Sequence, residues 1–306
     1  MILLWGIEQD RPLMAVREAL ARRNLPVLFI DQMQVMSTSI DFTFGAELTG
    51  TVTTQAGTHN LAAITAAYVR SYSALDAPGI RHAGENSREW QHALAVDDTI
   101  MVWLDVTKAR VINPLAAMAS NNSKPYQMSL IRAGGFAVPD TIVTTSAAAV
   151  AEFRARHGEI IYKSVSGVRS IVSRFTAAHE PRLADIRWCP TQFQQYIPGQ
   201  DFRVHVVGEE IFTCAIKSDA DDYRYAGRTG AAAVLSASHI PPDVAARCHG
   251  LAHGLGLIVA GIDLRRTPAG EFYCFEVNPS PAFSYYEEGT GHKIADAVAG
   301  LLAGAA

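Results

Sequence analysis

The segment that most constrains the fold is residues 261–278, where two apolar stretches flank a Pro-Gly turn and carry carboxylates that a buried sheet would not otherwise include. This pattern is typical of a β-hairpin. Asp263 lies in the first stretch, and Glu276 and Asn278 end the second. Because side chains alternate along a strand, Glu276 and Asn278 share one face. The segment therefore predicts a hairpin that collects oxygen-bearing side chains.

The register of this hairpin decides whether Asp263 joins them. We expect the turn to pair Arg266 with Glu271, which places Asp263 opposite Cys274 and diagonal to Glu276. Two anions and an amide on one face repel each other unless a cation lies between them, and Mg²⁺ accepts one or two carboxylates together with phosphate oxygens. A nucleotide-bound Mg²⁺ is the expected occupant. A register shifted by one residue would turn Asp263 to the opposite face, and a solvated hairpin with scattered charges is the alternative.

The composition narrows the class of protein. The chain has 306 residues, of which 49% are hydrophobic and 18% charged, as expected for a globular protein of two or three lobes. Its net charge is −4 without a polybasic run, so we expect no nucleic-acid partner. No apolar run reaches the roughly 18 residues that span a bilayer, so no membrane partner is expected. The N-terminus reads as a first strand, and four dispersed cysteines indicate reduced thiols in a cytoplasmic protein.

The order of apolar segments indicates an α/β protein. Residues 2–7, 12–23 and 26–31 form a strand, helix and strand, a unit typical of a parallel sheet. A new unit begins near Ser120. Further strands are expected at 51–54, 66–71, 139–144 and 159–163 and in several short pieces from 192 to 233, with helices at 88–104, 124–133, 146–157, 242–254 and 292–302.

Lysine is scarce, with 5 residues against 21 arginines, and three lysines fall at informative places: Lys124, Lys163 and Lys217. Lys163 ends a predicted strand directly before the small-residue loop 164–169. An ammonium there can reach phosphate oxygens while backbone N–H groups of the loop approach the same anion. The loop matches neither the Walker nor the Rossmann glycine pattern. A strand-end lysine in solvent is the alternative.

The segment 191–208 predicts two strands around a Pro-Gly kink, with Asp201 and Arg203 at the start of the second. A backbone that bends away from its sheet exposes N–H and C=O groups that can pair with an adenine edge. Asp201 could then accept hydrogen bonds from ribose hydroxyls, and Arg203 could bind phosphate or carboxylate in bidentate fashion. An ordinary hairpin with a surface Asp–Arg pair is the alternative.

Taken in order, these pieces resemble the ATP-grasp superfamily, closest to its ribosomal-protein glutamate ligase branch and to the graspetide ligases, which modify peptides. The resemblance spans about residues 110–290 and rests on segments 122–127, 161–163, 194–203, 260–264 and 275–281. It implies an ATP-grasp fold in which ATP lies between a central and a C-terminal lobe. The implied domains are residues 1–115, an N-terminal α/β domain, residues 116–194, the central lobe, and residues 195–306, the C-terminal lobe with the metal site.

The resemblance also implies roles for individual residues. Lys124 and Lys163 would contact the phosphates of ATP. Adenine would lie against the backbone of Gln195, Tyr196 and Ile197, with ribose near Asp201. Mg²⁺, with Mn²⁺ as the alternative metal, would be held by Asp263, Glu276 and Asn278. The reacting end would be lined by Arg203, Lys217, Arg224 and Arg265.

The implied function is an ATP-dependent carboxylate–amine ligase that forms an amide bond through an acyl phosphate. Its substrate would be an amino acid, a peptide or a protein, and a homo-oligomer is the working expectation. The alternatives are a kinase of the same fold and a non-catalytic ATP-binding regulatory protein. A Rossmann dehydrogenase is disfavoured because residues 5–10 lack the glycine fingerprint.

Overall fold

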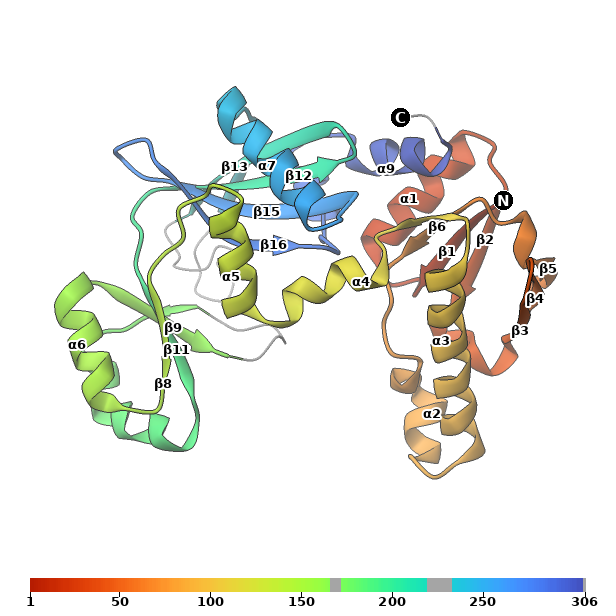
Figure 1. The fold of residues 1–306 in the computed structure, drawn as a ribbon, viewed down its shortest axis with the longest axis horizontal. Helices are drawn as coiled ribbons and strands as arrows, with labels where there is room; N and C mark the ends of the chain where they lie inside the picture. The colour runs from red at the N-terminus through yellow and green to blue at the C-terminus, as the bar shows by residue number, and fades with distance from the viewer. Residues whose placement is uncertain (166–171, 219–232, 305–306) are drawn as a thin grey trace.

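The N-terminal part of the chain forms the predicted parallel sheet (Figure 1), in a computed structural model that describes residues 1–165, 172–218 and 233–304. Strand β1 (Ile2–Gly6) lies inside this sheet and all five of its residues are buried, as expected for a strand covered on both faces. The sheet order is β2-β1-β6-β7, with β2 at Val27–Asp31, β6 at Ala66–Val69 and β7 at Arg110–Ile112.

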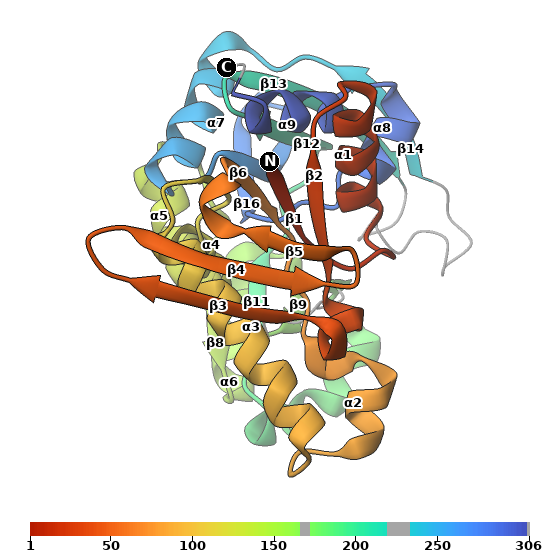
Figure 2. The same cartoon turned by 90° about the vertical axis from the view of Figure 1, so that its right-hand side faces the viewer.

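Helix α1 (Arg11–Arg22) begins where its sequence provides a cap. The Asp10 carboxylate accepts a hydrogen bond from the backbone N–H of Leu13 at 2.8 Å, and Leu13, Val16 and Leu20 are buried at helical spacing. The other helices of this part are α2 (Pro78–Ala83), α3 (Arg88–Val106) and the short 3₁₀ segments η1 (Gln32–Ser37), η2 (Leu61–Ala63) and η3 (Ala74–Asp76). A separate antiparallel sheet crosses the front of Figure 2 and contains β3 (Ser39–Phe44), β4 (Leu48–Thr54) and β5 (Gly57–Asn60).

The central sheet is antiparallel and has the order β10-β9-β11-β8. Its strands are β8 (Thr141–Thr144), β9 (Ile160–Ser164), β10 (Ser173–Arg174) and β11 (Thr191–Gln195). Phe193 projects from one face into an apolar cluster with Phe153 of helix α6 (Ala147–His157) and with Ile186 of the 3₁₀ segment η5 (Ala177–Trp188). The opposite face is therefore the one that can line a cleft.

The C-terminal sheet is also antiparallel and is packed on one face by helix α7 (Pro242–Gly254). Its order is β14-β13-β12-β15-β16, with β12 at Gln200–Val207, β13 at Glu210–Ser218, β14 at Ala233–Ser238, β15 at Val259–Arg266 and β16 at Phe272–Asn278. Two helices follow, α8 (Ser284–Thr290) and α9 (Ile294–Leu302). No helix within the described ranges combines the length and the apolar character that crossing a membrane requires.

Two helices make contacts across the predicted domain boundaries. Helix α5 (Lys124–Ala133) falls within 116–194, yet its Ile131 is buried against the C-terminal sheet. It follows the short turns α4 (Leu115–Met118) and η4 (Ala119–Asn122). Helix α9 falls within 195–306, yet Val298 packs with Leu20 of α1 in the N-terminal core, and α9 lies beside α1 in Figure 1. Helices near the two ends of the chain therefore pack against each other.

A single buried carboxamide, Asn113, joins the N-terminal sheet to the C-terminal sheet. Its Nδ2 donates to the carbonyl oxygens of Val259 and Pro279, both at 2.6 Å. Its Oδ1 accepts from the backbone N–H groups of Ile258 at 2.8 Å and Val259 at 2.9 Å. Buried backbone groups need hydrogen-bond partners, and the Asn113 carboxamide supplies them for these four N–H and C=O groups.

We predict that Asn113→Ala lowers the free energy of unfolding by about 3 kcal/mol or more, because it leaves several buried backbone groups without partners. Urea unfolding followed by circular dichroism measures the change. Asn86→Ala is the matched control, since Asn86 is exposed and should change stability by no more than about 0.5 kcal/mol. Equal stability of the two variants would show that Asn113 does not join the lobes.

Candidate active site

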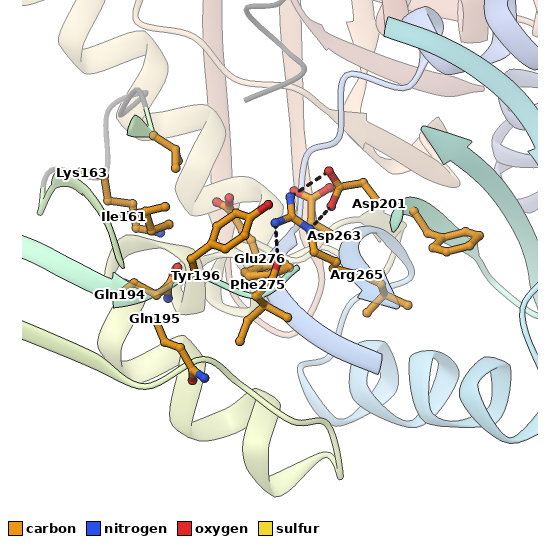
Figure 3. Close-up of a pocket in the computed structure, with 14 residues that line it drawn as sticks. Ile161, Lys163, Gln194, Gln195, Tyr196, Asp201, Asp263, Arg265, Phe275 and Glu276 are labelled. Carbon is orange, nitrogen blue, oxygen red and sulfur yellow. Dashed lines mark hydrogen bonds and ion pairs between the residues drawn. The ribbon is translucent and has the colours of Figure 1, made fainter. Parts of the chain in front are cut away.

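A pocket lies between the central and C-terminal sheets (Figure 3). Of the twelve residues selected from the sequence that the structure describes, eight line it: Lys163, Gln195, Tyr196, Ile197, Asp201, Asp263, Arg265 and Glu276. Apolar side chains complete the walls, among them Ile161, Phe202 and Phe275. Two antiparallel sheets thus bring together residues separated by more than a hundred positions in sequence.

The chain passes from the central sheet to the C-terminal sheet through residues 196–199, at the edge of this pocket. Gly199 has a φ of +151°, and a Cβ there would lie 2.2 Å from the carbonyl oxygen of Arg266. Only glycine tolerates this conformation and close approach. The predicted Pro-Gly kink is therefore present, directly after residues 195–197, which line the pocket.

Asp201 and Arg265 form a bidentate pair across strands β12 and β15 (Figure 3), with Arg265 Nε 2.6 Å from Oδ1 and Nη2 2.9 Å from Oδ2. Arg265 Nη1 also donates to the carbonyl oxygen of Ile197 at 2.8 Å. Burial alone would lower the pKa of Arg265, but the hydrogen bonds to Asp201 and the negative charge of Asp201 leave that pKa raised. Arg265 thus braces the crossing segment, and the role at the reacting end that the resemblance implies for it stays a prediction.

The predicted register of the β15–β16 hairpin is wrong, and Leu264, not Asp263, lies opposite Cys274, although Asp263 still shares a face with Glu276. The turn pairs Arg266 with Phe272 and not with Glu271, a shift that alone would turn Asp263 away from Glu276. A bulge between Asp263 and Leu264 shifts the register once more. Asp263 consequently lies directly opposite Glu276, where side chains of an antiparallel pair point the same way.

Each of these two carboxylates pairs with a protein cation. Arg203 Nη1 donates to Asp263 Oδ1 at 2.7 Å across β12 and β15, and Lys124 Nζ donates to Glu276 Oε1 at 2.8 Å. Both carboxylates are about one-fifth exposed, whereas the Arg203 side chain is 6% exposed. Removing charges from water is costly unless they are paired. The cations that the anionic face requires are therefore supplied by side chains.

Arg203 is held in place by three neighbours that the sequence analysis did not select. Its Nε lies 3.5 Å from His205 Nε2, and its guanidinium lies over the ring of Tyr286 at 5.5 Å. Burial, then the Arg203 charge, holds the pKa of His205 well below its ordinary value, so the ring stays neutral and can accept a hydrogen bond. Gly261 leaves room, since a Cβ there would lie 2.3 Å from Arg203 Nη2.

Lys124 is placed by Gln127, one helical turn later. Gln127 Nε2 donates to the Val277 carbonyl at 2.7 Å, and Gln127 Oε1 accepts from the Val277 N–H at 3.0 Å. The carboxamide therefore acts as a strand partner for the open edge of β16. Because residues three apart share a helix face, this contact directs Lys124 toward Glu276. That spacing is the signal in the sequence from which Gln127 could have been found.

Two further predicted residues, Asn278 and Lys217, are not among the residues that line the pocket. Asn278 follows Glu276 on the same face of β16, and its Oδ1 accepts from the Ser280 N–H at 2.9 Å. Lys217 is exposed, and the β12–β13 register places it on the opposite face of the sheet from Arg203. Arg224 lies outside the described residues. The roles assigned to Lys217, Arg224 and Asn278 stay predictions.

The donor set suits Mg²⁺. Asp263 and Glu276 offer two facing carboxylates, and Asn278 offers an amide oxygen beside them. Among the residues that the structure describes, no cluster of three or more His, Cys, Asp or Glu side chains could hold a metal alone. Mg²⁺ typically binds one or two carboxylates and completes its shell with phosphate oxygens and water. The residues present therefore fit a metal that arrives with a nucleotide.

Residues 163–302 match the model of the RimK-like ATP-grasp domain. A probable alpha-L-glutamate ligase of Xylella fastidiosa (strain M12) is 28% identical over 197 residues, which cover 60% of this chain and 64% of that protein. The chain thus spans less than two thirds of that relative's length.

Two solved structures are similar over nearly the whole chain. A Chryseobacterium gregarium RiPP-associated ATP-grasp ligase, solved with ADP and a leader and core peptide, superimposes with a TM-score of 0.84 at 19% identity, covering 100% of this chain and 97% of that one. The ATP-grasp ligase PsnB, solved with a phosphomimetic variant of its minimal precursor, Mg and ADP, gives 0.82 at 24% identity, covering 99% and 98%. The chain therefore has the ATP-grasp fold, and its residues 163–302 are similar to the RimK-like ATP-grasp domain.

Proposed function

We propose that this protein is an ADP-forming ligase that joins a carboxylate to an amine through an acyl phosphate. The observation that carries the proposal is the pair of facing carboxylates, Asp263 and Glu276, each held by a cation at one end of a pocket that Lys163 also lines. The cations can neutralise the charge of a polyphosphate, and the carboxylates can bind its metal ion. Catalysis then needs orientation and charge stabilisation, and no nucleophile on the protein.

The pocket supports a defined orientation for ATP. Adenine lies against the backbone of residues 195–197, because these residues line the pocket and its apolar walls suit a base. Asp201 lies near the start of strand β12, a few residues after this segment, and Arg265 fixes its side chain. The Asp201 carboxylate is therefore positioned to accept hydrogen bonds from ribose hydroxyls. The phosphates then extend toward Lys163 and toward the carboxylates of the C-terminal sheet. Asp263, Glu276 and Asn278 would hold Mg²⁺, which would supply positive charge to the phosphate oxygens.

The chemistry proceeds in two displacements. A substrate carboxylate oxygen attacks the γ-phosphorus, the bond to the β-phosphate oxygen breaks, and the products are an acyl phosphate and ADP. An amine nitrogen then attacks the acyl carbon, inorganic phosphate leaves, and the nitrogen loses a proton. Lys124 and Arg203 stabilise negative charge on the transferring phosphoryl group, and both already lie beside the carboxylates that hold the metal.

The acyl donor belongs to the class of amino acids, peptides and proteins, and a peptide is favoured. Of the two similar structures reported above, one was solved with a leader and core peptide and the other with a variant of a minimal precursor, and both align over nearly the whole chain. The curated relative is named for glutamate, which supports an amino acid as one of the two substrates.

The proposal predicts release of ADP that depends on an acidic substrate and trapping of the intermediate. The enzyme is incubated with ATP, Mg²⁺, hydroxylamine and a panel of free glutamate and peptides that contain Asp, Glu and Lys. An acyl phosphate reacts with hydroxylamine to give a hydroxamate. When hydroxylamine is left out, mass spectrometry of the product should show either the loss of water, on cyclisation, or the gain of an amine minus water. A product that gains phosphate and resists hydroxylamine would identify a kinase instead, and ATP binding without any turnover across the panel would favour a regulatory protein.

Glu276→Gln is predicted to lower turnover at least about a hundredfold, because it removes a metal ligand and the partner of Lys124. ADP release at saturating ATP and Mg²⁺ measures the loss. The control is Glu271→Gln, which makes the same chemical change at an exposed site in the same hairpin and should keep turnover within about twofold. Retained activity in Glu276→Gln would contradict the metal assignment.

Gly261→Ala is predicted to reduce kcat/KM by about tenfold or more while the protein remains folded, because the new Cβ displaces the Arg203 guanidinium. Pro281 is also close, at 2.7 Å from that Cβ, so a modest decrease in Tm is expected. Gly250→Ala is the control, because a Cβ at Gly250 meets no atom within 4 Å and alanine favours its helix. Full activity of Gly261→Ala would show that the position of Arg203 does not matter.

A further inference from the structure

Gln192 of β11 is buried without a hydrogen-bond partner in the part of the chain that the structure describes. Its exposed fraction is 1%, and neither Oε1 nor Nε2 is bonded. An unpaired carboxamide in the interior is costly, and such groups are rare in native proteins. A leucine or methionine would fill the same space without that cost. The amide is therefore placed as if for a ligand.

The strand pattern directs Gln192 toward the nucleotide pocket. Phe193 projects into the apolar cluster on the far side of the central sheet, so Gln192 and Gln194 project from the near side. Gln194 lines the pocket. In the β9–β11 register, Gln192 lies opposite Lys163, and Gln194 lies opposite Ile161, and both of those partners line the pocket as well.

The same register places Gln192 at the level of the phosphates. The proposed adenine site begins at Gln195, and three residues of extended strand separate it from Gln192, a distance of about 10 Å. Lys163 lies in the same row, with a Cβ separation of about 5 Å expected for opposite residues of an antiparallel pair. A nucleotide with its base at Gln195 therefore extends its phosphates toward this row.

We propose that Gln192 is a further nucleotide-binding residue, whose Nε2–H group donates to a phosphate oxygen that Lys163 also holds. This inference rests on the proposed function, since it requires ATP in this pocket. Gln192 does not itself line the pocket, so the contact requires its side chain to rotate toward Lys163. A hydrogen bond from an amide to a charged oxygen is stronger than one between neutral groups, which offsets the cost of the buried amide.

The test compares nucleotide binding by the wild-type protein and by Gln192→Met, a variant of similar length without a donor. Calorimetry with Mg²⁺ and ATP, ADP or adenosine gives the dissociation constants. We expect about tenfold weaker binding of ATP and ADP, with adenosine affinity unchanged within about twofold. Gln192→Glu should bind ATP more weakly still, because its carboxylate repels the phosphates.

Thermal unfolding without nucleotide provides the second measurement. Gln192→Met should raise Tm by about 2 °C or more, because it removes an unpaired buried amide. Gln194→Met, on the same face of the same strand, should lower Tm, since Gln194 Nε2 donates to Thr141 Oγ1 at 3.0 Å. Both changes together support the inference.

The outcomes separate the two proposals. Unchanged ATP affinity in Gln192→Met, with normal binding by the wild type, overturns the role of Gln192 and leaves the proposed function intact. An equal loss of adenosine and ATP affinity also overturns it, because the amide would then act on the base or on the fold. A wild-type protein that does not bind ATP overturns the proposed function itself.

Discussion

The site depends on the neutralisation of two carboxylates that face each other across one hairpin. Asp263 and Glu276 are partly buried and in direct register, so their repulsion would destabilise the hairpin if no cation were near. Arg203 and Lys124 supply the positive charge from two other elements, β12 and α5. The same ion pairs keep both cations where a polyphosphate would need them. The same ion pairs thus stabilise the unliganded fold and position the two cations for binding phosphate.

Side-chain amides hold this arrangement together by completing backbone pairing where strands end. Gln127 pairs with Val277 at the edge of β16, and Asn113 pairs with the start of β15 and with Pro279. Each contact fixes a helix or a sheet relative to the hairpin that carries the carboxylates. Gln192 is the contrasting case, a buried amide that completes no such pairing among the described residues. That contrast is why we assign it to a ligand.

Much of the fold could be predicted, because local patterns report local structure. The helices expected at 124–133 and 242–254 have those bounds in the structure, and the helix expected from residue 146 is capped by the Ser146 hydroxyl oxygen, which accepts a hydrogen bond from the Ala149 N–H at 3.3 Å. The parallel N-terminal sheet follows from its strand–helix–strand order. The hairpin register could not be predicted, because the bulge beside Asp263 has no signature in residue types. The packing of α9 on α1 was also missed, because a periodic apolar face does not name its partner.

By itself the sequence determined which chemical groups are available: scarce lysines at element ends, carboxylates and an amide in one hairpin, and a Pro-Gly kink between two strands. Those features follow from residue type and spacing, which fix the period of each element and the side chains it carries. Only the tertiary structure decided which cation meets which anion. Arg265 braces Asp201 and Ile197, whereas Arg203 reaches Asp263, because strand order and a single bulge set the cross-strand neighbours. Such pairings depend on contacts between residues far apart in the chain, and no local pattern encodes them.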